Sequence, residues 1–411
     1  MNPQRCKFRR QPSNLRKCHL KIVLISPTAN SYTANKDSQL PINYASLGVP
    51  RVINVAGNMT FLGGSIMPPE VVTAWTEAST AFVDLADLQR KAGERIASLL
   101  GVEAALVTSG AAGAILLGVA ASVTGTDEKR IAQLPDTTGL SNEVILQRTH
   151  HSEYDPQLLT PGTKLIDVET SEDLEHAITP HTALMFYANY AAASGEISKA
   201  EWLQVARRHN IPTMIDISAD IPPLERIKEY RQQGFDLLAV SGGKALRGPN
   251  DTGLLLGRPE LIEAARRNTS PYEPTIGRVM KVGKEDTMAL LAAVERFVSV
   301  DQQAETKEIH RRIDVIEQGL KQFPALSFER IIPEVANHQP HLIIDWDESK
   351  TGFSVTQVRQ KLKDGQPSII TSRVVGTGNK GLLIAVLALQ PGEEQIVAER
   401  LQAIFLELQK R

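Results

Sequence analysis

The sequence predicts an α/β fold in which helices cover both faces of a mostly parallel β-sheet. Short apolar runs alternate with helical patterns from residue 104 to residue 268. These runs are continuously apolar, which is typical of strands buried on both faces. Three of them lead into polar or glycine-rich residues at their carboxyl ends, where sheets of this kind bind ligands.

Composition sets limits on the class of protein. With 411 residues, 42% of them hydrophobic, the chain can bury a large core in one large and one small domain or in two to three domains. The net charge of −2 offers no general attraction to nucleic acid or anionic membranes. No apolar run approaches the ~20 residues of a membrane span. The only cysteines, Cys6 and Cys18, encode no disulfide framework and favour a reducing, cytoplasmic setting. No metal-ligand spacing is present, so no metal is expected.

Residues 1–43 are expected to form a basic, disordered extension. Seven lysines and arginines lie between Arg5 and Lys21, and the first acidic residue is Asp37. Organelle transit peptides and RNA-binding arms share this composition. We favour a simple extension because the segment lacks both an amphipathic period and interleaved aromatic residues.

The remaining elements follow in order. An extended segment with two glycine-rich turns occupies 44–65, and helices are predicted from Pro68 and over 85–100. The main strands are predicted at 104–107, 143–147, 164–168, 182–187, 211–216, 235–240 and 251–257. Further helices are expected at 114–123, 198–209, 259–268 and from about 285. This large domain would span 44–322. A small α/β domain, 323–411, would contain strands 342–346, 368–372 and 382–387 and an amphipathic helix over 393–409.

Three features of the predicted sheet would together suit one cofactor. Lys244 lies in a Ser-Gly-Gly-Lys turn after strand 235–240. Burial beside packed strands favours its neutral, nucleophilic amine. Asp216 ends an earlier strand, and the turn 107–113 opens a helix that could bind phosphate. Each signal alone fits an ordinary turn or helix cap. In this order they match pyridoxal phosphate, which needs a Schiff-base lysine, an acid at its ring nitrogen and a phosphate site.

The chain resembles the fold-type I pyridoxal-phosphate enzymes from Tyr44 to its C-terminus. The branch is that of L-seryl-tRNA(Sec) selenium transferase and D-glucosaminate-6-phosphate ammonia-lyase. The motifs that carry the resemblance are 52–57 with 62–65, 108–112, 147–150, Asp216, 241–244 and 276–285. It implies a large domain with a seven-stranded, mostly parallel sheet, a smaller C-terminal domain, and a homodimer or higher symmetric oligomer.

The resemblance also implies residue roles around the cofactor. Lys244 would form the Schiff base and Asp216 would hold the ring nitrogen protonated. His150 would stack on the ring, whereas His151 replaces an arginine that relatives often carry. The residues expected to bind the phosphate or line the cofactor are Ser109, Gly110, Ala111, Ser218 and Ser241.

Four residues are expected to bind the substrate. Thr60 belongs to the segment that crosses the mouth of the site in this family, where Asn58 and Ser65 would also lie. Arg278 and Lys281 would bind anionic groups, although a solvated basic face explains them equally well. Arg373 would bind the α-carboxylate as a bidentate pair.

The expected reaction is α,β-elimination from an amino acid or amino-sugar acid. It would proceed through a Lys244 aldimine and a quinonoid and would release ammonia and a 2-keto acid. Racemisation, aldol cleavage and transamination need the same residues and stay open. A selenium transferase is less well supported because that enzyme carries an added tRNA-contacting module that the short arm cannot replace. A non-catalytic RNA-binding scaffold is opposed by the retained Lys244 and Asp216.

Overall fold

The computed structural model describes residues 42–335, 338–372 and 381–409. The chain divides into two units, 1–50 and 51–411. In the first, residues 42–50 form a turn in which the Asn43 side chain accepts a hydrogen bond from the Ser46 amide (3.0 Å). Almost all of the predicted extension, and Arg373 with it, lies outside the described residues.

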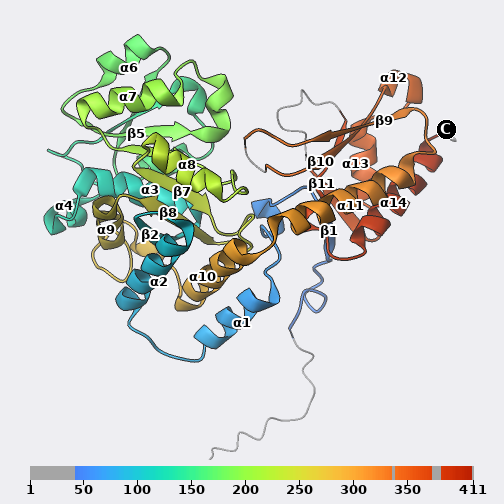
Figure 1. The fold of residues 1–411 in the computed structure, drawn as a ribbon, viewed down its shortest axis with the longest axis horizontal. Coiled ribbons are helices and arrows are strands. Elements are labelled where there is room, and N and C mark those ends of the chain that lie inside the picture. Colours follow the sequence, from blue (N-terminus) through green and yellow to red (C-terminus); the bar gives the residue numbers. More distant parts are fainter. Residues whose placement is uncertain (1–41, 336–337, 373–380, 410–411) are drawn as a thin grey trace, which may run out of the picture. The chain divides into compact units, whose positions relative to one another are not determined.

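A seven-stranded sheet with the order β2-β8-β7-β6-β5-β3-β4 organises the large part of unit 51–411 (Figure 1). Strand β8 runs antiparallel to both β2 and β7, and the other pairs are parallel, which confirms the predicted architecture. Since β2 and β7 each oppose β8, their carboxyl ends lie at the same edge as that of β6. The strands are β2 (Ala104–Ser109), β3 (Glu143–Gln147), β4 (Lys164–Val168), β5 (Thr182–Ala188), β6 (Thr213–Asp216), β7 (Leu237–Ser241) and β8 (Thr252–Gly257).

Helices pack on both faces of this sheet. Successive residues point into different cores, with Ile215 in one cluster and Met214 in the other. Both faces are therefore buried, which explains the continuously apolar strands. The helices of this part are α1 (Pro69–Ala78), α2 (Leu85–Leu100), α3 (Gly110–Thr124), α4 (Glu128–Gln133), α5 (Asp155–Leu159), α6 (Ser171–Ala177), α7 (Lys199–His209), α8 (Glu225–Gln233), α9 (Pro259–Arg267) and α10 (Lys284–Ser299).

The C-terminal part has its own hydrophobic core. A three-stranded antiparallel sheet has the order β12-β10-β9, and β1 (Val52–Val55) pairs in parallel with β11 (Ser368–Thr371). Ile53 of β1 and Ile313 of α11 belong to this core. A boundary near residue 300 therefore fits the packing better than the expected boundary at 322/323, and the division stays a proposal. The other elements are α11 (Gln302–Leu320), β9 (Leu326–Ile331), β10 (His341–Trp346), α12 (Glu348–Thr351), α13 (Val355–Lys363), β12 (Leu382–Ile384), η5 (Val386–Ala388) and α14 (Glu393–Leu408).

Two predicted boundaries differ from the structure by more than two residues. The strand expected over 382–387 ends at Ile384, and the chain turns into η5. Helix α3 begins at Gly110, earlier than expected, because Gly110 takes φ +69° directly after β2. Within the described residues, no helix is both long enough and apolar enough to cross a lipid bilayer.

Candidate active site

Three polar residues end strands at one edge of the large sheet. Ser109 is the last residue of β2, Asp216 of β6 and Ser241 of β7. Lys244 follows β7 by three residues. The parallel direction of these strands therefore gathers the predicted cofactor residues, which lie up to 135 residues apart in the chain (244 − 109).

Close packing fixes the turn that carries Lys244. The Gly242 amide donates to the Thr252 carbonyl oxygen, and the Arg247 amide donates to that of Lys244 (2.9 and 3.0 Å). A Cβ atom on Gly242 would lie 2.3 Å from the Thr252 hydroxyl, and one on Gly243 would lie 2.6 Å from the Asn250 Cα. Only glycine fits at these two positions, so the Gly-Gly pair holds the lysine at a fixed place on the sheet edge.

Ser218 connects the lysine with the buried acid. Its amide donates to Asp216 Oδ1 (2.8 Å), and its hydroxyl lies 3.4 Å from Lys244 Nζ. Burial lowers the pKa of Lys244, against the opposing charges of Asp216 and Asp220. Burial also raises the pKa of Asp216, opposed by the Ser218 amide and by the charge of Lys244. Both shifts favour the uncharged forms when no cofactor is bound, so the lysine has a readily neutral amine. A cation placed beside Asp216 would favour its carboxylate form.

The turn from β2 into α3 leaves backbone amides free to bind an anion. Ser109 is the N-cap of α3, and its side chain makes no capping hydrogen bond. The space above Gly110 is open, with no atom within 4 Å of a Cβ built there. On the other side, a Cβ on Gly253 would lie 2.3 Å from the Gly110 carbonyl carbon. The first amides of α3, including that of Ala111, can therefore meet a phosphate group at the helix N-terminus.

The basic segment 277–284 approaches the start of α3. A Cβ on Gly113 would lie 3.9 Å from Met280 Sδ, so η4 (Arg278–Met280) packs beside the first turn of α3. Arg278 pairs with Glu273 (2.5 Å), while Lys281 is exposed. This places two of the predicted substrate residues beside the phosphate turn, and their role stays a prediction.

His150 is a buried, neutral histidine. It ends η2 (Arg148–His150), is 1% exposed, and its ring meets Tyr187 edge-on with ring centroids 4.6 Å apart. The Ala188 amide donates to its Nδ1 (3.2 Å). Burial, followed by the charge of Lys199, lowers the pKa of His150 to about 4. The ring has little open surface, so stacking on a cofactor stays a prediction.

His151 is held between two carboxylates. Its Nδ1 lies 2.6 Å from Asp155 and its Nε2 lies 2.8 Å from Asp167. Burial alone would lower the pKa of His151, but the hydrogen bonds to Asp155 and Asp167 outweigh it and the pKa is raised. The imidazolium is therefore occupied by protein carboxylates, which leaves it poorly placed to bind a substrate anion.

His151 should make the stability of the protein depend on pH. Its folded pKa lies above the unfolded value, so its contribution is complete below about pH 6.5 and is lost as the pH rises through the raised pKa. The side chain is 35% exposed, and the contribution should therefore be only about 0.5 kcal/mol. We expect His151→Gln to lower the midpoint of urea unfolding at pH 6 and not at pH 9. An equal effect of His151→Gln at both pH values would contradict the assignment.

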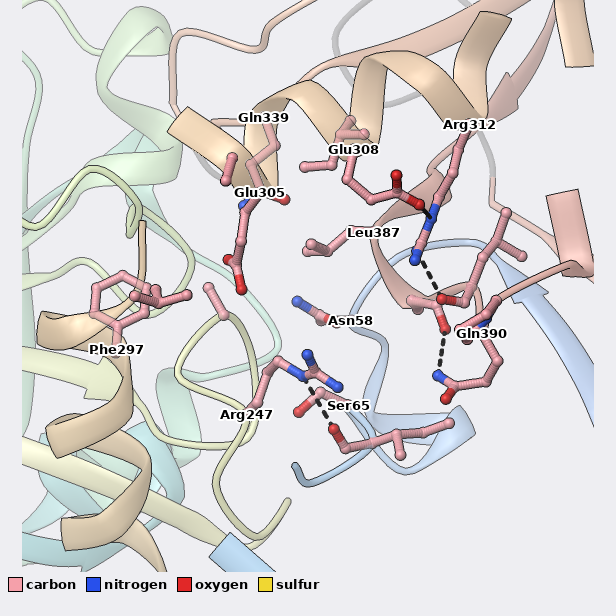
Figure 2. Close-up of a pocket in the computed structure, with 18 of the residues that line it drawn as sticks. Asn58, Ser65, Arg247, Phe297, Glu305, Glu308, Arg312, Gln339, Leu387 and Gln390 are labelled. Atoms are coloured by element: carbon pink, nitrogen blue, oxygen red, sulfur yellow. Dashed lines mark hydrogen bonds and ion pairs between the residues drawn. The ribbon is translucent and has the colours of Figure 1, made fainter. Parts of the chain in front are cut away.

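A cavity of about 500 Å³ begins next to the lysine turn. Ala245 and Arg247 line it, but Lys244 does not. Asn58 and Ser65, which were expected near the substrate, line it from the N-terminal segment (Figure 2). Thr60, in η1 (Thr60–Leu62), is exposed and is not among the lining residues, so its substrate role stays a prediction.

Sequence reasoning missed two residues of this region. Asp220 is 2% exposed and acts on the charge of Lys244, but its short loop carries no recognisable pattern. Arg247 was included in the lysine motif without a role. Its backbone φ of +60°, unusual for a residue other than glycine, is visible only in the folded chain.

Comparison with known proteins agrees with this geometry. The model of the aminotransferase class-V family matches residues 72–329. The chain belongs to the aminotransferase class-V family. As a class-V protein it takes pyridoxal phosphate, and Lys244, Asp216 and the start of α3 fit the aldehyde, ring nitrogen and phosphate of that cofactor.

Similar curated proteins cover most of this class-V chain. D-glucosaminate-6-phosphate ammonia lyase of Salmonella typhimurium is 28% identical, over 84% of this chain and 97% of its own. A 5'-C-glycyluridine monooxygenase-decarboxylase of a Streptomyces species is 29% identical, over 89% and 92%. L-seryl-tRNA(Sec) selenium transferase of Caldanaerobacter subterraneus is 23% identical, over 87% and 83%.

A solved structure gives the same result for the fold. D-glucosaminate-6-phosphate ammonia-lyase superposes with a TM-score of 0.75 and 27% identity, covering 90% of this chain and all of its own. The predicted branch of the fold-type I enzymes is confirmed.

Proposed function

We propose that the protein is a pyridoxal-phosphate lyase that eliminates water from a hydroxylated 2-amino acid, such as an amino-sugar acid, and releases ammonia and a 2-keto acid. The observation that carries this is the buried Lys244–Ser218–Asp216 arrangement beside an open phosphate turn. The similarity to an ammonia lyase over 84% of the chain supports this outcome over the alternatives.

The chain's own residues perform the proton transfers. Pyridoxal phosphate, when bound, supplies an electron sink for the bond that breaks at the substrate Cα. Lys244, whose pKa burial lowers, removes the Cα proton as general base. Asp216 stabilises positive charge at the ring nitrogen, since a buried carboxylate is most stable beside a cation. The protonated Lys244 can give the Cα proton to the β-hydroxyl, which leaves as water. The resulting eneamine tautomerises to an imine, and a second water molecule hydrolyses the imine to the keto acid and ammonia.

A second candidate is oxidative decarboxylation. It is favoured by the 29% identity to a monooxygenase-decarboxylase over 89% of the chain. Both reactions require the same lysine and acid, but only this one consumes O₂ and releases CO₂.

The test is turnover of D-glucosaminate 6-phosphate and D-glucosaminate under argon and under air. The proposal expects equal amounts of ammonia and 2-keto acid, at the same rate with and without O₂. Turnover that depends on O₂ and releases CO₂ would replace the lyase with the second candidate. If neither compound reacts, amino acids with a β-leaving group should be screened in the same assay, and a failure to release keto acid from all of them would overturn the lyase assignment.

We also propose a homodimer or a higher symmetric oligomer in a cytoplasmic setting. Large apolar side chains at and around α1 are solvent-exposed in the single chain, Phe82 completely and Phe61 to 69%. Exposed apolar residues gathered along one segment are typical of an interface. Trp75 and Val83 belong to the same segment, with exposures of 40% and 53%.

A further inference from the structure

The cavity beside the lysine turn holds an arginine without an ionic partner. Within the described part of the chain, no carboxylate lies within ion-pair distance of the Arg247 guanidinium. Its one side-chain hydrogen bond runs from Nε to the Ile66 carbonyl oxygen (3.1 Å). The terminal nitrogens, which can bind an anion as a bidentate pair, thus have no hydrogen-bond acceptor among the described residues.

The other strong charges of the cavity are already paired. Glu308 forms an ion pair with Arg312 (2.9 Å), and Arg312 also donates to the Leu389 carbonyl oxygen (2.7 Å). Glu305 pairs with Arg296 (2.8 Å). Asp301 accepts hydrogen bonds from the Gln303 and Ala304 amides at the start of α11. Arg247 is therefore the one cation that lines the described cavity without a neutralising partner.

Neutral hydrogen-bonding groups surround this arginine. Ser65 Oγ and Gln339 Oε1 are buried without a hydrogen-bond partner in the described structure, and both side chains line the cavity. Asn58, which is 8% exposed, points into the same space in Figure 2. Buried polar atoms are normally satisfied, so the atoms of Ser65 and Gln339, with the Asn58 amide beside them, are suited to the hydroxyl groups of a ligand.

The backbone at Arg247 has a strained conformation. Its φ of +60° lies in the left-handed region, where a residue other than glycine is strained. The same turn carries Lys244, three residues earlier, through the hydrogen bond from the Arg247 amide to the Lys244 carbonyl oxygen. Lys244 and Arg247 therefore keep a fixed spacing in one turn, although only Arg247 lines the cavity itself.

We propose that Arg247 binds an anionic group of a hydroxylated acid substrate and that the cavity lined by Asn58, Ser65 and Gln339 receives its hydroxyl groups. This inference rests on the proposed lyase function and adds the residues that would bind the anionic group and the hydroxyl groups of the substrate. The anionic group is either a distal phosphate or the carboxylate.

The test uses two ligands that lack the 2-amino group and so cannot react with the cofactor. D-gluconate 6-phosphate and D-gluconate are titrated calorimetrically into the protein loaded with pyridoxal phosphate. Arg247→Met should raise the Kd of D-gluconate 6-phosphate about 10- to 100-fold. The exposed Arg130→Met should leave it unchanged. Glu305→Gln removes a negative charge that faces Arg247 and should lower the Kd severalfold, an effect that misfolding could not produce.

The two ligands identify the anionic group. Weaker binding of D-gluconate 6-phosphate alone assigns Arg247 to the phosphate, and an equal loss for both ligands assigns it to the carboxylate. An unchanged Kd for both in Arg247→Met would overturn the inference. If anion binding depends on Arg247 but no amino acid is turned over, the proposed lyase function is rejected and the proposed anion site at Arg247 is kept.

A glycine variant separates binding from a structural role. Arg247→Gly relieves the left-handed strain, so its thermal midpoint should equal or exceed that of the wild type while D-gluconate 6-phosphate binds as weakly as to Arg247→Met. A lowered midpoint with unchanged Kd would show that the arginine only supports the fold.

Discussion

Lys244→Ala is expected to lower kcat/KM by at least about 10³-fold, because in the proposed function one residue supplies both the covalent link to the cofactor and the general base. The purified variant should also lack the visible absorbance band of the lysine Schiff base. In the wild type, borohydride should abolish this band by reducing the Schiff base to a stable amine.

The exposed Lys129→Ala is the matched control and should keep both the band and the activity. A Lys244→Ala protein that still turned over substrate would remove the lysine from the mechanism. A wild-type protein that stays colourless with added pyridoxal phosphate would remove the cofactor from this site.

Asp216→Asn is expected to lower kcat by about 10²- to 10³-fold, the range for losing one preorganised electrostatic contact. The asparagine oxygen can still accept the Ser218 amide hydrogen bond, so the fold should persist and KM should change little. The loss should then be equal in kcat and in kcat/KM, as expected for an interaction that acts mainly in the transition state.

The surface variant Glu172→Gln tests whether any loss of a carboxylate has this effect. It should match the wild type in kcat and in cofactor affinity, since Glu172 is exposed on α6. If Asp216→Asn retained full activity with unchanged cofactor affinity, the acid would have no role at the ring nitrogen.

Local sequence patterns were sufficient to predict the strands of the large sheet. Its strands are short apolar runs between glycines, helix caps and prolines, and these signals depend only on neighbouring residues. The limits of helix α2 follow from the Asp84 cap and from Gly101 in the left-handed conformation. The order Ser109, Asp216, Lys244 could be interpreted as one cofactor site, because parallel strands place their carboxyl ends at one edge of the sheet.

The hydrophobic core of the C-terminal part could not be predicted from local patterns, because it depends on contacts between distant segments. Strand β1 pairs with β11, more than 300 residues later (Val52 with Ser368). Residues 52–55 were read as part of an extended segment, since nothing in four residues specifies a partner so far away. For the same reason the predicted boundary at 322/323 did not include α11 in the C-terminal core.

The sequence by itself determined the fold class and the family, because each rests on a local pattern of residue types, and the roles of the cofactor residues stay predictions. Only the tertiary structure decided which charged side chains have an ionic partner. It engages His151 with two carboxylates, and among the described residues it gives the Arg247 guanidinium in the cavity no carboxylate partner. Whether a charge is neutralised depends on which distant side chains the fold brings within a few ångströms, and no spacing along the chain encodes that distance.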